Sequence, residues 1–275
     1  MLEPKAITSL QNERVKAIRA LEMRKARKET GLFVAEGASL LITARDNGFV
    51  PKTLVYRAGS ATSDIAKGLV QWALGAGVEC LEVSEAVLGK LSSKDNPQSM
   101  IGVFEQRWSS LPKPEKVEDG AVWLALEEVR DPGNLGTIIR TADAAGASGV
   151  ILVGESTDPF SMETVRATMG SVFAVPLVKA TAADFLAWKK GAGVQVVATH
   201  LAGAVDYRTI DYRKKPVVLL MGNEQSGLPD EIAREADALA RIPQAGRADS
   251  LNLAIATGVM LFEARRHLLT LEERA

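Results

Sequence analysis

Cysteine and histidine, two residue types that often build metal and catalytic sites, are scarce in this chain of 275 residues. It contains one cysteine, Cys80, and two histidines, His200 and His267, which lie in different segments. A single cysteine excludes an intrachain disulfide bond and a zinc site with several thiolate ligands, and it fits a reducing compartment. Two distant histidines disfavour a histidine metal cluster and a Ser/His/Asp triad. We therefore expect no bound metal and a chemistry that uses almost no imidazole.

Long apolar runs and net charge are also lacking. No apolar run approaches the roughly 18–20 residues that span a bilayer, and no charged-then-apolar leader opens the chain, so we expect a cytoplasmic protein. The formal net charge is −1 and the isoelectric point is near 6.2, so no global positive field exists to hold a polyanion. A composition of 47% hydrophobic and 24% charged residues is typical of a soluble globular protein.

A local excess of positive charge remains at the start of the chain. Residues 1–30 hold eight lysines and arginines against four glutamates. Half of these basic residues are clustered at Arg24, Lys25, Arg27 and Lys28. The cluster is either a contact for an anionic partner or a solvated helix face laced with opposite charges, and charge alone favours neither interpretation.

The segment Arg107–Gly120 divides the chain into two parts. Its sequence, RWSSLPKPEKVEDG, has two prolines, mixed charge and no periodicity, as linkers between domains do. We therefore predict a domain at 1–106, a linker at 107–119 and a second domain at 120–275. Strands and helices alternate at short spacing in the first part, which predicts a small α/β domain. The expected helices there are Asn12–Lys28, Ala38–Asp46, Asp64–Leu74 and Glu85–Leu91, and the expected strands are Leu32–Val34, Thr53–Tyr56, Glu79–Val83 and Met100–Phe104.

The second part alternates longer apolar strands with helices. Near-continuous apolar runs are typical of strands buried on both faces of a parallel sheet, so we expect a C-terminal parallel-sheet α/β domain. Ser250 is a good N-cap for the last helix, in which Ala254, Thr257, Leu261, Ala264 and Leu268 form a mostly apolar stripe. The expected strands are Ala121–Leu126, Val150–Val153, Phe173–Val178, Val194–Thr199 and Val217–Met221, and the other helices are Leu135–Ala145, Met162–Met169, Ala182–Lys189 and Glu231–Ala236.

Three polar, glycine-bearing patches adjoin these apolar runs. They are Arg130–Arg140 (RDPGNLGTIIR), Leu220–Pro229 (LMGNEQSGLP) and Ile242–Asn252 (IPQAGRADSLN). A strand that stops at Pro, Gly and Asn and restarts as a helix forms a strand-to-helix turn, and ligands bind at such carboxyl ends of parallel strands. Turn chemistry alone also explains Pro, Gly and Asn. Three such turns in one domain predict one composite pocket.

Turn formation does not explain some of the side chains in the patches. Glu224 follows a buried strand and would be desolvated without a partner, for which Arg140 is the candidate; the alternative is a solvent-facing glutamate in a tight turn. Ser250 starts the last helix, and Asn252 would lie one turn inside it. Free amides at a helix N-terminus suit an anion, although a plain N-cap accounts for Ser250. The run Gly246, Arg247 and Asp249 is not explained by the cap.

At these patches the chain resembles the SpoU family, also called the TrmH family, of RNA ribose 2′-O-methyltransferases in the SPOUT class. The resemblance rests on NLGTIIRTADAAG, LLMGNEQSGLP and IPQAGRADSLNLAIATGVMLFEARR, which occur in this order. It extends over residues 120–275. The first half resembles the substrate-binding domain of many members, an α/β fold similar to an RNA-binding ribosomal protein. That similarity lies in NERVKAIRALEMRKARKETGLFVAEGASLL and DNPQSMIGVF.

The resemblance implies a fold, a cofactor and an assembly. The second domain would carry a deep trefoil knot, an exception to the rule against threaded loops. S-adenosylmethionine would bind bent in the knot, and the protein would work as a homodimer through the last helix and the helix of the first patch. The positions that match the family's cofactor-binding residues are Leu220, Met221, Gly222, Ile242, Pro243, Leu251 and Leu253.

The resemblance also assigns polar site residues. Asn134, Arg140, Glu224, Ser250 and Asn252 match the family's catalytic positions, and Arg166 in VRATMGSVF matches a segment that touches RNA. A ribose 2′-hydroxyl must lose its proton while its oxygen lines up behind the sulfonium methyl group. The family proposal makes the arginine the base, but a guanidinium group normally stays protonated. Arg140 either takes the proton or anchors an RNA phosphate and stabilises the alkoxide.

The leading hypothesis is methylation of a ribose 2′-hydroxyl in structured RNA, with ribosomal RNA of the large subunit preferred over transfer RNA because of the extra N-terminal domain. One alternative is a catalytically silent RNA-binding or ribosome-assembly protein, which the intact polar residues oppose. Another is a transfer RNA 2′-O-methyltransferase. Methylation of a base is disfavoured, because the first patch resembles the ribose-acting branch.

Overall fold

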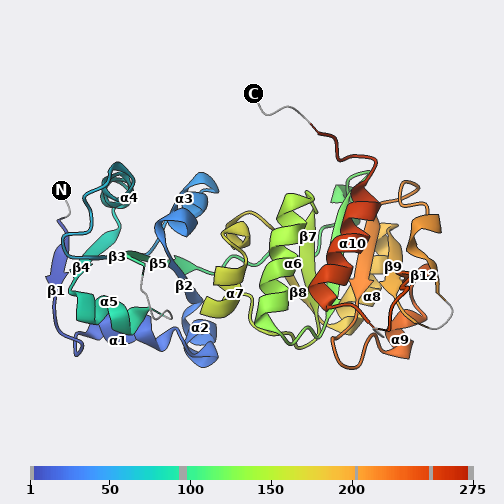
Figure 1. Ribbon diagram of the computed structural model, residues 1–275, viewed down its shortest axis with the longest axis horizontal. Coiled ribbons are helices and arrows are strands. Elements are labelled where there is room, and N and C mark those ends of the chain that lie inside the picture. Colours follow the sequence, from blue (N-terminus) through green and yellow to red (C-terminus); the bar gives the residue numbers. More distant parts are fainter. Residues whose placement is uncertain (1–2, 93–97, 202–203, 248–249, 272–275) are drawn as a thin grey trace. The chain divides into compact units, whose positions relative to one another are not determined.

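The computed structural model describes residues 3–92, 98–201, 204–247 and 250–271. The chain forms two compact units, each with its own sheet (Figure 1). The first contains Met1–Arg107 and Asp158–Ala174, and the second contains Trp108–Thr157 and Val175–Ala275. The first unit therefore includes a segment from the second half of the sequence. Within the described ranges, no helix has the length and apolar character needed to cross a membrane.

The first unit is built on a mixed five-stranded sheet in the order β1-β4-β3-β5-β2. β1, β4 and β3 run parallel, whereas β5 is antiparallel to β3 and β2. The small α/β architecture predicted for this part is confirmed. Its strands are β1 (Lys5–Ile7), β2 (Leu32–Glu36), β3 (Thr53–Arg57), β4 (Glu79–Val83) and β5 (Met100–Glu105), and its helices are α1 (Glu13–Ala20), α2 (Arg24–Thr30), α3 (Ala38–Asp46), α4 (Asp64–Gly75) and α5 (Glu85–Leu91).

The single basic helix predicted at Asn12–Lys28 is wrong, because the chain turns between α1 and α2. Asn12 caps α1 by accepting the N–H of Arg14. The N–H groups of Leu21 and Glu22 then bond to carbonyls three residues earlier, which ends the helix. The side chain of Arg27 in α2 donates to the carbonyls of Leu21 and Glu22, so the break is closed from the next helix.

The inserted segment Asp158–Ala174 leaves the second sheet after β7 (Gly149–Val153) and rejoins it at β8 (Leu177–Ala180). It forms α7 (Met162–Ala167) and a short 3-10 turn, η2 (Ser171–Phe173). The rings of Phe160 and Phe173 are buried, with centroids 4.9 and 5.8 Å from that of Phe33. The strand predicted at Phe173–Val178 therefore begins only at Leu177, because Phe173 packs into this aromatic cluster instead of extending the sheet.

The second unit contains an all-parallel seven-stranded sheet in the order β10-β12-β9-β11-β6-β7-β8, as the parallel α/β prediction requires. Five apolar strands were predicted from the sequence, and the short edge strand β10 and its neighbour β12 were not. The remaining strands are β6 (Val122–Glu127), β9 (Gln195–Thr199), β10 (Val205–Asp206), β11 (Val217–Met221) and β12 (Ala238–Arg241), and the helices are α6 (Pro132–Ala144), α8 (Ala182–Ala192), α9 (Asp230–Ala233) and α10 (Leu253–Arg265), with 3-10 turns η1 (Pro114–Lys116) and η3 (Tyr207–Thr209).

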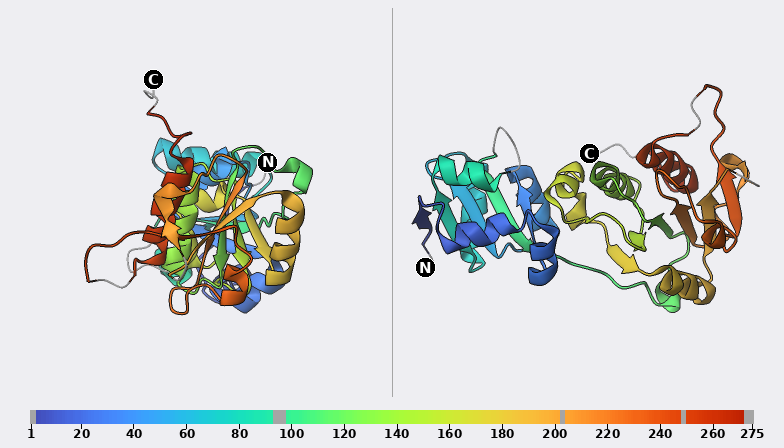
Figure 2. Two further views of the ribbon diagram at one scale, coloured as in Figure 1. Left: turned by 90° about the vertical axis from the view of Figure 1, so that its right-hand side faces the viewer. Right: turned by 90° about the horizontal axis from the view of Figure 1, so that it is seen from below.

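Helices cover both faces of the parallel sheet. α8 and α9 contribute Phe185 and Ile232 to a core that contains Trp123 and Val218. α6 and α10 lie side by side, and α10 contacts the central strands β6 and β11. Figure 2 shows α6 and α10 on one side of this sheet and α8 on the other. Both faces of the central strands are therefore buried, and only the strand ends remain for a ligand.

The segment predicted as a linker is fixed to the second unit. The N–H of Ser109 donates to the carbonyl of Leu177, and Ser109 bridges to Val178 on the edge strand β8. The indole N–H of Trp188 in α8 donates to the carbonyl of Pro112 at 2.7 Å. Leu111 and Val117 pack against the core of this unit. This stretch therefore serves as a cover for the sheet edge, and its prolines and mixed charge do not indicate a free chain.

Candidate active site

The three polar patches meet at the carboxyl end of the parallel sheet. The first contains the start of α6, the second follows β11, and the third leads into α10. Asn252 donates its side-chain amide to Oδ1 of Asn134 at 2.9 Å, and Asn134 donates to Oε1 of Glu224 at 3.2 Å. One hydrogen-bonded chain thus links one residue from each patch. All three patches also line one cavity, which confirms the prediction of a composite pocket.

Glu224 is held by N–H groups at the beginning of α6. Its Oε2 accepts the backbone N–H of Arg130 at 3.2 Å, and its Oε1 accepts that of Asp131 at 3.4 Å in addition to the amide of Asn134. Asp131 in turn caps α6 by accepting the N–H of Asn134 at 2.6 Å. A carboxylate is favourable at the positive end of a helix. The sequence Asp-Pro-Gly-Asn starts α6 at this point, and the helix start in turn supplies the donors that hold Glu224.

The expected ion pair between Glu224 and Arg140 is not formed. Arg140 lies six residues after Asn134 on α6, which places it about 9 Å farther along the helix axis. Its side chain is exposed, does not line the cavity, and makes no ion pair with any residue in the described ranges. The prediction failed because Glu224 is exposed and not desolvated, as the alternative of a solvent-facing glutamate required, and because backbone N–H groups stabilise its carboxylate.

The turn after β11 is fixed by close backbone packing and by Asn223. A Cβ atom on Gly222 would lie 2.4 Å from the carbonyl carbon of Gly227 and from the nitrogen of Leu228, so only glycine fits there. Oδ1 of Asn223 accepts the N–H groups of Gln225 and Ser226, and its amide donates to the carbonyl of Glu128 at 2.7 Å. The turn is thus tied to the loop after β6.

The loop after β6 carries strain and a perturbed carboxyl group. Glu128 has φ of +44°, a left-handed conformation that is costly for a residue with a Cβ atom. Burial raises the pKa of the neighbouring Glu127, Glu128 raises it further, and Arg130 opposes the shift. Strained backbone is often retained where it positions functional groups, and this loop supplies the N–H of Arg130 to Glu224.

The predicted N-cap of the last helix is wrong. Asn252 caps α10, because its Oδ1 accepts the N–H groups of Ala254 at 2.9 Å and Ile255 at 3.2 Å. The helix therefore begins at Leu253, and Asn252 lies before the helix and not one turn inside it. Ser250 lines the cavity two residues earlier. Asp249, which the sequence also singled out, lies outside the described residues.

The cavity beside this chain has a volume of about 650 Å³. That volume is within the range of roughly 300–1,000 Å³ for small-molecule sites. It is lined by five of the seven residues that the resemblance assigned to cofactor binding: Met221, Gly222, Ile242, Leu251 and Leu253. Two other expected contacts do not: Leu220 is 1% exposed and packs in the sheet core, and Pro243 is not part of the lining.

His200 and Arg241 also line the cavity and were missed from the sequence. They follow β9 and end β12, and the N–H of His200 donates to the carbonyl of Ala240. Nε2 of His200 lies 3.7 Å from Oδ1 of Asp230. The available signal was positional, since His200 follows an apolar strand directly, as Gly222 does.

Comparisons with known proteins agree with this geometry. Residues 121–262 match the model of the SpoU rRNA Methylase family, and residues 12–102 match that of the MRM3-like substrate binding domain. The chain belongs to the SpoU rRNA methylase family. A Bacillus subtilis relative, 23S rRNA (guanosine(2553)-2′-O)-methyltransferase RlmP, is 32% identical over 95% of this chain and 99% of its own length.

Solved structures extend the comparison. The AdoMet-bound rRNA methyltransferase from Sinorhizobium meliloti is 62% identical, with a TM-score of 0.90 over 97% of this chain and 99% of that one. The SpoU methyltransferase AviRb from Streptomyces viridochromogenes, in complex with AdoMet, is 30% identical, with a TM-score of 0.84 over 94% and 98%. An Escherichia coli tRNA (guanosine(18)-2′-O)-methyltransferase matches only 52% of this chain, at 39% identity over 62% of its own length.

The cavity of this SpoU-family chain fits S-adenosylmethionine by its lining. Apolar side chains such as Met221, Leu251 and Leu253 suit an adenine ring, and amide, hydroxyl and imidazole groups suit ribose and amino-acid groups. In the described part of the chain, no group of three or more His, Cys, Asp or Glu side chains is placed to hold a metal ion.

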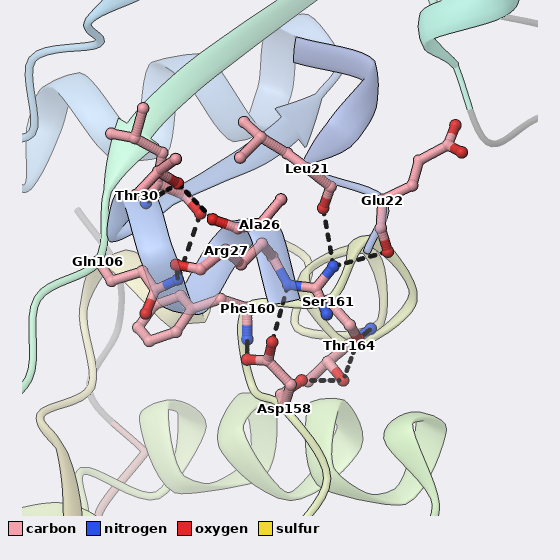
Figure 3. Close-up of polar contacts among 11 residues, drawn as sticks. Leu21, Glu22, Ala26, Arg27, Thr30, Gln106, Asp158, Phe160, Ser161 and Thr164 are labelled. Atoms are coloured by element: carbon pink, nitrogen blue, oxygen red, sulfur yellow. Dashed lines mark hydrogen bonds and ion pairs between the residues drawn. The ribbon is translucent and has the colours of Figure 1, made fainter. Parts of the chain in front are cut away.

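The candidate RNA contacts lie in the first unit and divide by exposure. Arg24, Lys25 and Lys28 are exposed on α2, and Arg166 is exposed on α7. Arg27 is only 4% exposed, and its guanidinium group is bonded to Asp158 and to two backbone carbonyls (Figure 3). Arg27 is therefore not available to an RNA phosphate, and its assignment as an RNA contact is corrected to a structural one.

Proposed function

We propose that this SpoU-family protein transfers the methyl group of S-adenosylmethionine to a ribose 2′-hydroxyl of large-subunit ribosomal RNA. The observation that carries the proposal is the chain Asn252–Asn134–Glu224 at the edge of a cavity that fits the methyl donor. The donor, when bound, supplies an electrophilic methyl group on a positively charged sulfur. The protein must then orient the ribose hydroxyl, stabilise its developing negative charge and exclude water.

The polar chain orients the nucleophile. Asn134 uses its side-chain oxygen for Asn252 and one amide hydrogen for Glu224, so its orientation is fixed before RNA binds. Asn252 is fixed as well, because its oxygen caps α10. Ser250 lines the same cavity and offers a hydroxyl group to the RNA. Pre-oriented groups of this kind lower the cost of aligning the ribose oxygen with the methyl group.

Arg140 supplies positive charge from outside the cavity of its own chain. Its guanidinium group is exposed, so it can bind an RNA phosphate or the developing alkoxide without first breaking an ion pair. Either role, or acceptance of the 2′-hydroxyl proton, makes Arg140 essential. Backbone N–H groups, and not Arg140, hold the carboxylate of Glu224, so the guanidinium group stays available for an RNA group. Anchoring or charge stabilisation is the favoured role, because a guanidinium group normally stays protonated.

We further propose a homodimer formed through α10 and α6. Ile255 and Phe262 on α10 are 57% and 47% exposed, which leaves apolar surface beside the neighbouring helix α6. Pairing through this surface would bury these side chains and bring Arg140, on α6, near the interface. The deep trefoil knot, a cytoplasmic location and the sequence domains 1–106 and 120–275, of which the second lends Asp158–Ala174 to the first unit, complete the proposal.

Two features favour ribosomal over transfer RNA. Two relatives that match at least 90% of the chain act, by their names, on 23S rRNA, and a third is named as a tRNA/rRNA methyltransferase, whereas the tRNA (guanosine(18)-2′-O)-methyltransferase matches only about half of the chain. The part that this tRNA relative leaves unmatched has the size of the first unit, which carries the exposed basic side chains of α2 and Arg166. The first unit would then select the RNA, and the second would carry out methyl transfer.

The test is incubation with S-adenosylmethionine tritiated on its methyl group and with RNA from a strain that lacks this gene. Nucleoside analysis should find the label on ribose, at a site in 23S rRNA that is unmethylated in the deletion strain. Label found only on bases would refute the proposal, and label found only in tRNA would refute the ribosomal assignment. Absence of any label with intact RNA binding would favour the silent RNA-binding alternative.

A further inference from the structure

The segment Asp158–Ala174 belongs to one part of the molecule by sequence and to another by contacts. The SpoU family model spans residues 121–262 and includes it, yet it packs within the first unit, with Met1–Arg107. The chain therefore passes between the units three times, after Arg107, Thr157 and Ala174. The first unit is not complete without a piece of the catalytic half of the sequence.

Both ends of the segment are anchored by aromatic rings. Phe160 lies near one end and contacts Phe33, and Phe173 lies near the other and contacts Phe33, Phe49 and Phe104. Gly170 approaches Thr43 so closely that an added Cβ atom would lie 3.0 Å from that side chain. These apolar contacts hold the segment against the first unit, and its helix α7 packs on β2 as well.

A buried ion pair adds directed contacts to this packing (Figure 3). Nε of Arg27 donates to Oδ2 of Asp158 at 2.7 Å, and the side chains are 5% and 14% exposed. A further guanidinium nitrogen of Arg27 donates to the carbonyls of Leu21 and Glu22 at 2.7 and 2.8 Å. One side chain thus joins the end of α1, the helix α2 and the inserted segment.

Asp158 also forms hydrogen bonds with α7 and with the turn before it. Its Oδ1 accepts the N–H of Phe160 at 2.9 Å, and its carbonyl accepts the hydroxyl of Thr164 at 3.1 Å. Thr164 is fully buried in α7, and its N–H is capped by Ser161. Arg166, two residues later, is exposed. Asp158 is therefore joined to α7, which carries Arg166, through its carbonyl, and to the turn before α7 through its carboxylate.

The residue before Asp158 is linked to the catalytic loop. The N–H of Thr157 donates to the carbonyl of Val129 at 2.8 Å. Val129 lies between the strained Glu128 and Arg130, whose N–H holds Glu224. Thr157 is thus anchored within the second unit, so a displacement of Asp158 would act mainly on the segment that follows it, which carries Arg166.

The Arg27–Asp158 pair could instead serve only to stabilise the fold, but a charged pair is poorly suited to that role at a buried position. A buried ion pair pays a large desolvation cost, and well-packed apolar residues of similar volume often stabilise a protein as well or better. The surroundings are already apolar and aromatic. Charged groups with several directed hydrogen bonds instead specify one geometry, which apolar side chains do not.

We infer that Arg27 and Asp158 are positioning residues for RNA, an inference that rests on the proposed function. They hold the segment Asp158–Ala174 in the orientation in which Arg166 contacts the RNA, and neither touches the substrate itself. RNA recognition by the first unit then depends on a piece of the catalytic half, while binding of S-adenosylmethionine in the second unit does not depend on the pair.

The test compares full-length Arg27→Met, Asp158→Leu and the double variant, with Arg27→Lys as a conservative change. Arg57→Met and the double variant Arg57→Met with Glu85→Leu are matched controls, because Arg57 and Glu85 form an exposed ion pair 3.5 Å apart in the same unit. The readouts are thermal unfolding, the Kd of S-adenosylmethionine, and kcat and KM for the RNA that the wild-type protein methylates.

Each single variant should raise KM for RNA by roughly tenfold or more, as a misplaced positioning group does, and should lower thermal stability. The double variant should regain part of this stability, because its two apolar side chains can pack together while the carbonyls of Leu21 and Glu22 still lack the guanidinium donor. Its KM should stay high. Arg27→Lys should give an intermediate KM, and all variants should keep the wild-type Kd for S-adenosylmethionine.

A double variant with wild-type KM would overturn the inference and reduce the pair to a stabilising contact. The same holds if Arg27→Lys or a folded single variant binds RNA like wild type. If the single variants do not fold, the double variant and Arg27→Lys still decide the question. Absence of RNA methylation by the wild-type protein would instead refute the proposed function, which keeps the two failures apart.

Discussion

The two units use polar side chains in opposite ways. In the second unit, Asn134, Glu224 and Asn252 form a hydrogen-bonded chain at the open end of the sheet, beside a cavity. In the first unit, Arg27 and Asp158 form a pair that is almost fully buried among helices and phenylalanine rings. The first group is placed where a substrate can reach it, whereas the second can act only through the structure that it holds.

The same contrast separates Arg140, which was predicted to be catalytic, from Arg27, which was predicted to contact RNA. Arg140 is exposed, and the described residues offer it no ion pair, so its hydrogen-bonding capacity is free for RNA. The guanidinium group of Arg27 already donates hydrogen bonds to Asp158 and to two backbone carbonyls. Loss of the first should therefore affect activity more than folding, and loss of the second should affect folding together with RNA affinity.

Substitution of Arg140 should have the largest effect on activity. Arg140→Ala removes an exposed charge, so it should unfold like wild type, while kcat/KM should fall by about 100-fold to 1,000-fold, as loss of one electrostatic group at a reacting centre does. Arg140→Lys should recover only part of the activity, because an ammonium group lacks the guanidinium fork. Full activity of Arg140→Ala, measured with tritiated S-adenosylmethionine, would remove Arg140 from the mechanism.

Truncation of Phe160 should affect the first unit more than the second. Phe160 is 2% exposed, so Phe160→Ala should destabilise the protein by about 3–5 kcal/mol through lost burial and a cavity. Cys80, the only cysteine, reports on this unit: it is buried, and burial raises the pKa of its thiol to about 11. At pH 8 the folded protein therefore holds a protonated, unreactive thiol, and labelling requires opening of the unit.

The matched control for Phe160→Ala is Phe185→Ala, which truncates a fully buried ring in the core of the second unit. Labelling of Cys80 by iodoacetamide should be faster in Phe160→Ala than in Phe185→Ala at equal loss of total stability. Equal labelling rates would show that the two units open together. The two units would then not differ in their free energies of opening.

Local patterns predicted much of both units, and long-range contacts account for what they missed. Ala38–Asp46, Glu79–Val83 and Glu85–Leu91 form the predicted helix, strand and helix at the predicted bounds, because caps and apolar periodicity are local. The meeting of the three patches followed from a rule about parallel strands.

The burial of Arg27 depends on Asp158, which is 131 residues away, and no local pattern reports such a pair. The strand β12 was missed for a related reason: Ala238–Arg241 is short and only partly buried, so its pairing with β9 decides its conformation. The preference for Asn252 over Ser250 as N-cap was likewise set by the tertiary position of the third patch, beside Asn134.

Reversal of the exposed charges on α2 should have a moderate effect on RNA binding. Arg24→Glu, Lys25→Glu and Lys28→Glu together should weaken binding about tenfold at moderate salt and flatten its salt dependence, because fewer phosphates would be neutralised. Lys67→Glu with Lys90→Glu is the control, since both lysines are exposed in the same unit. Unchanged binding in filter assays across a salt series would return α2 to a solvated helix face.

The smallest expected effect separates the two polar residues before α10. Asn252→Ala should lower the free energy of unfolding by about 1 kcal/mol, because two N–H groups at the helix start lose their acceptor. Ser250→Ala should change it by less than about 0.5 kcal/mol, since Ser250 is exposed and does not cap the helix. Urea unfolding measures both. Equal losses would mean that Ser250 also supports α10. Its role would then be structural, as the role of Arg27 is.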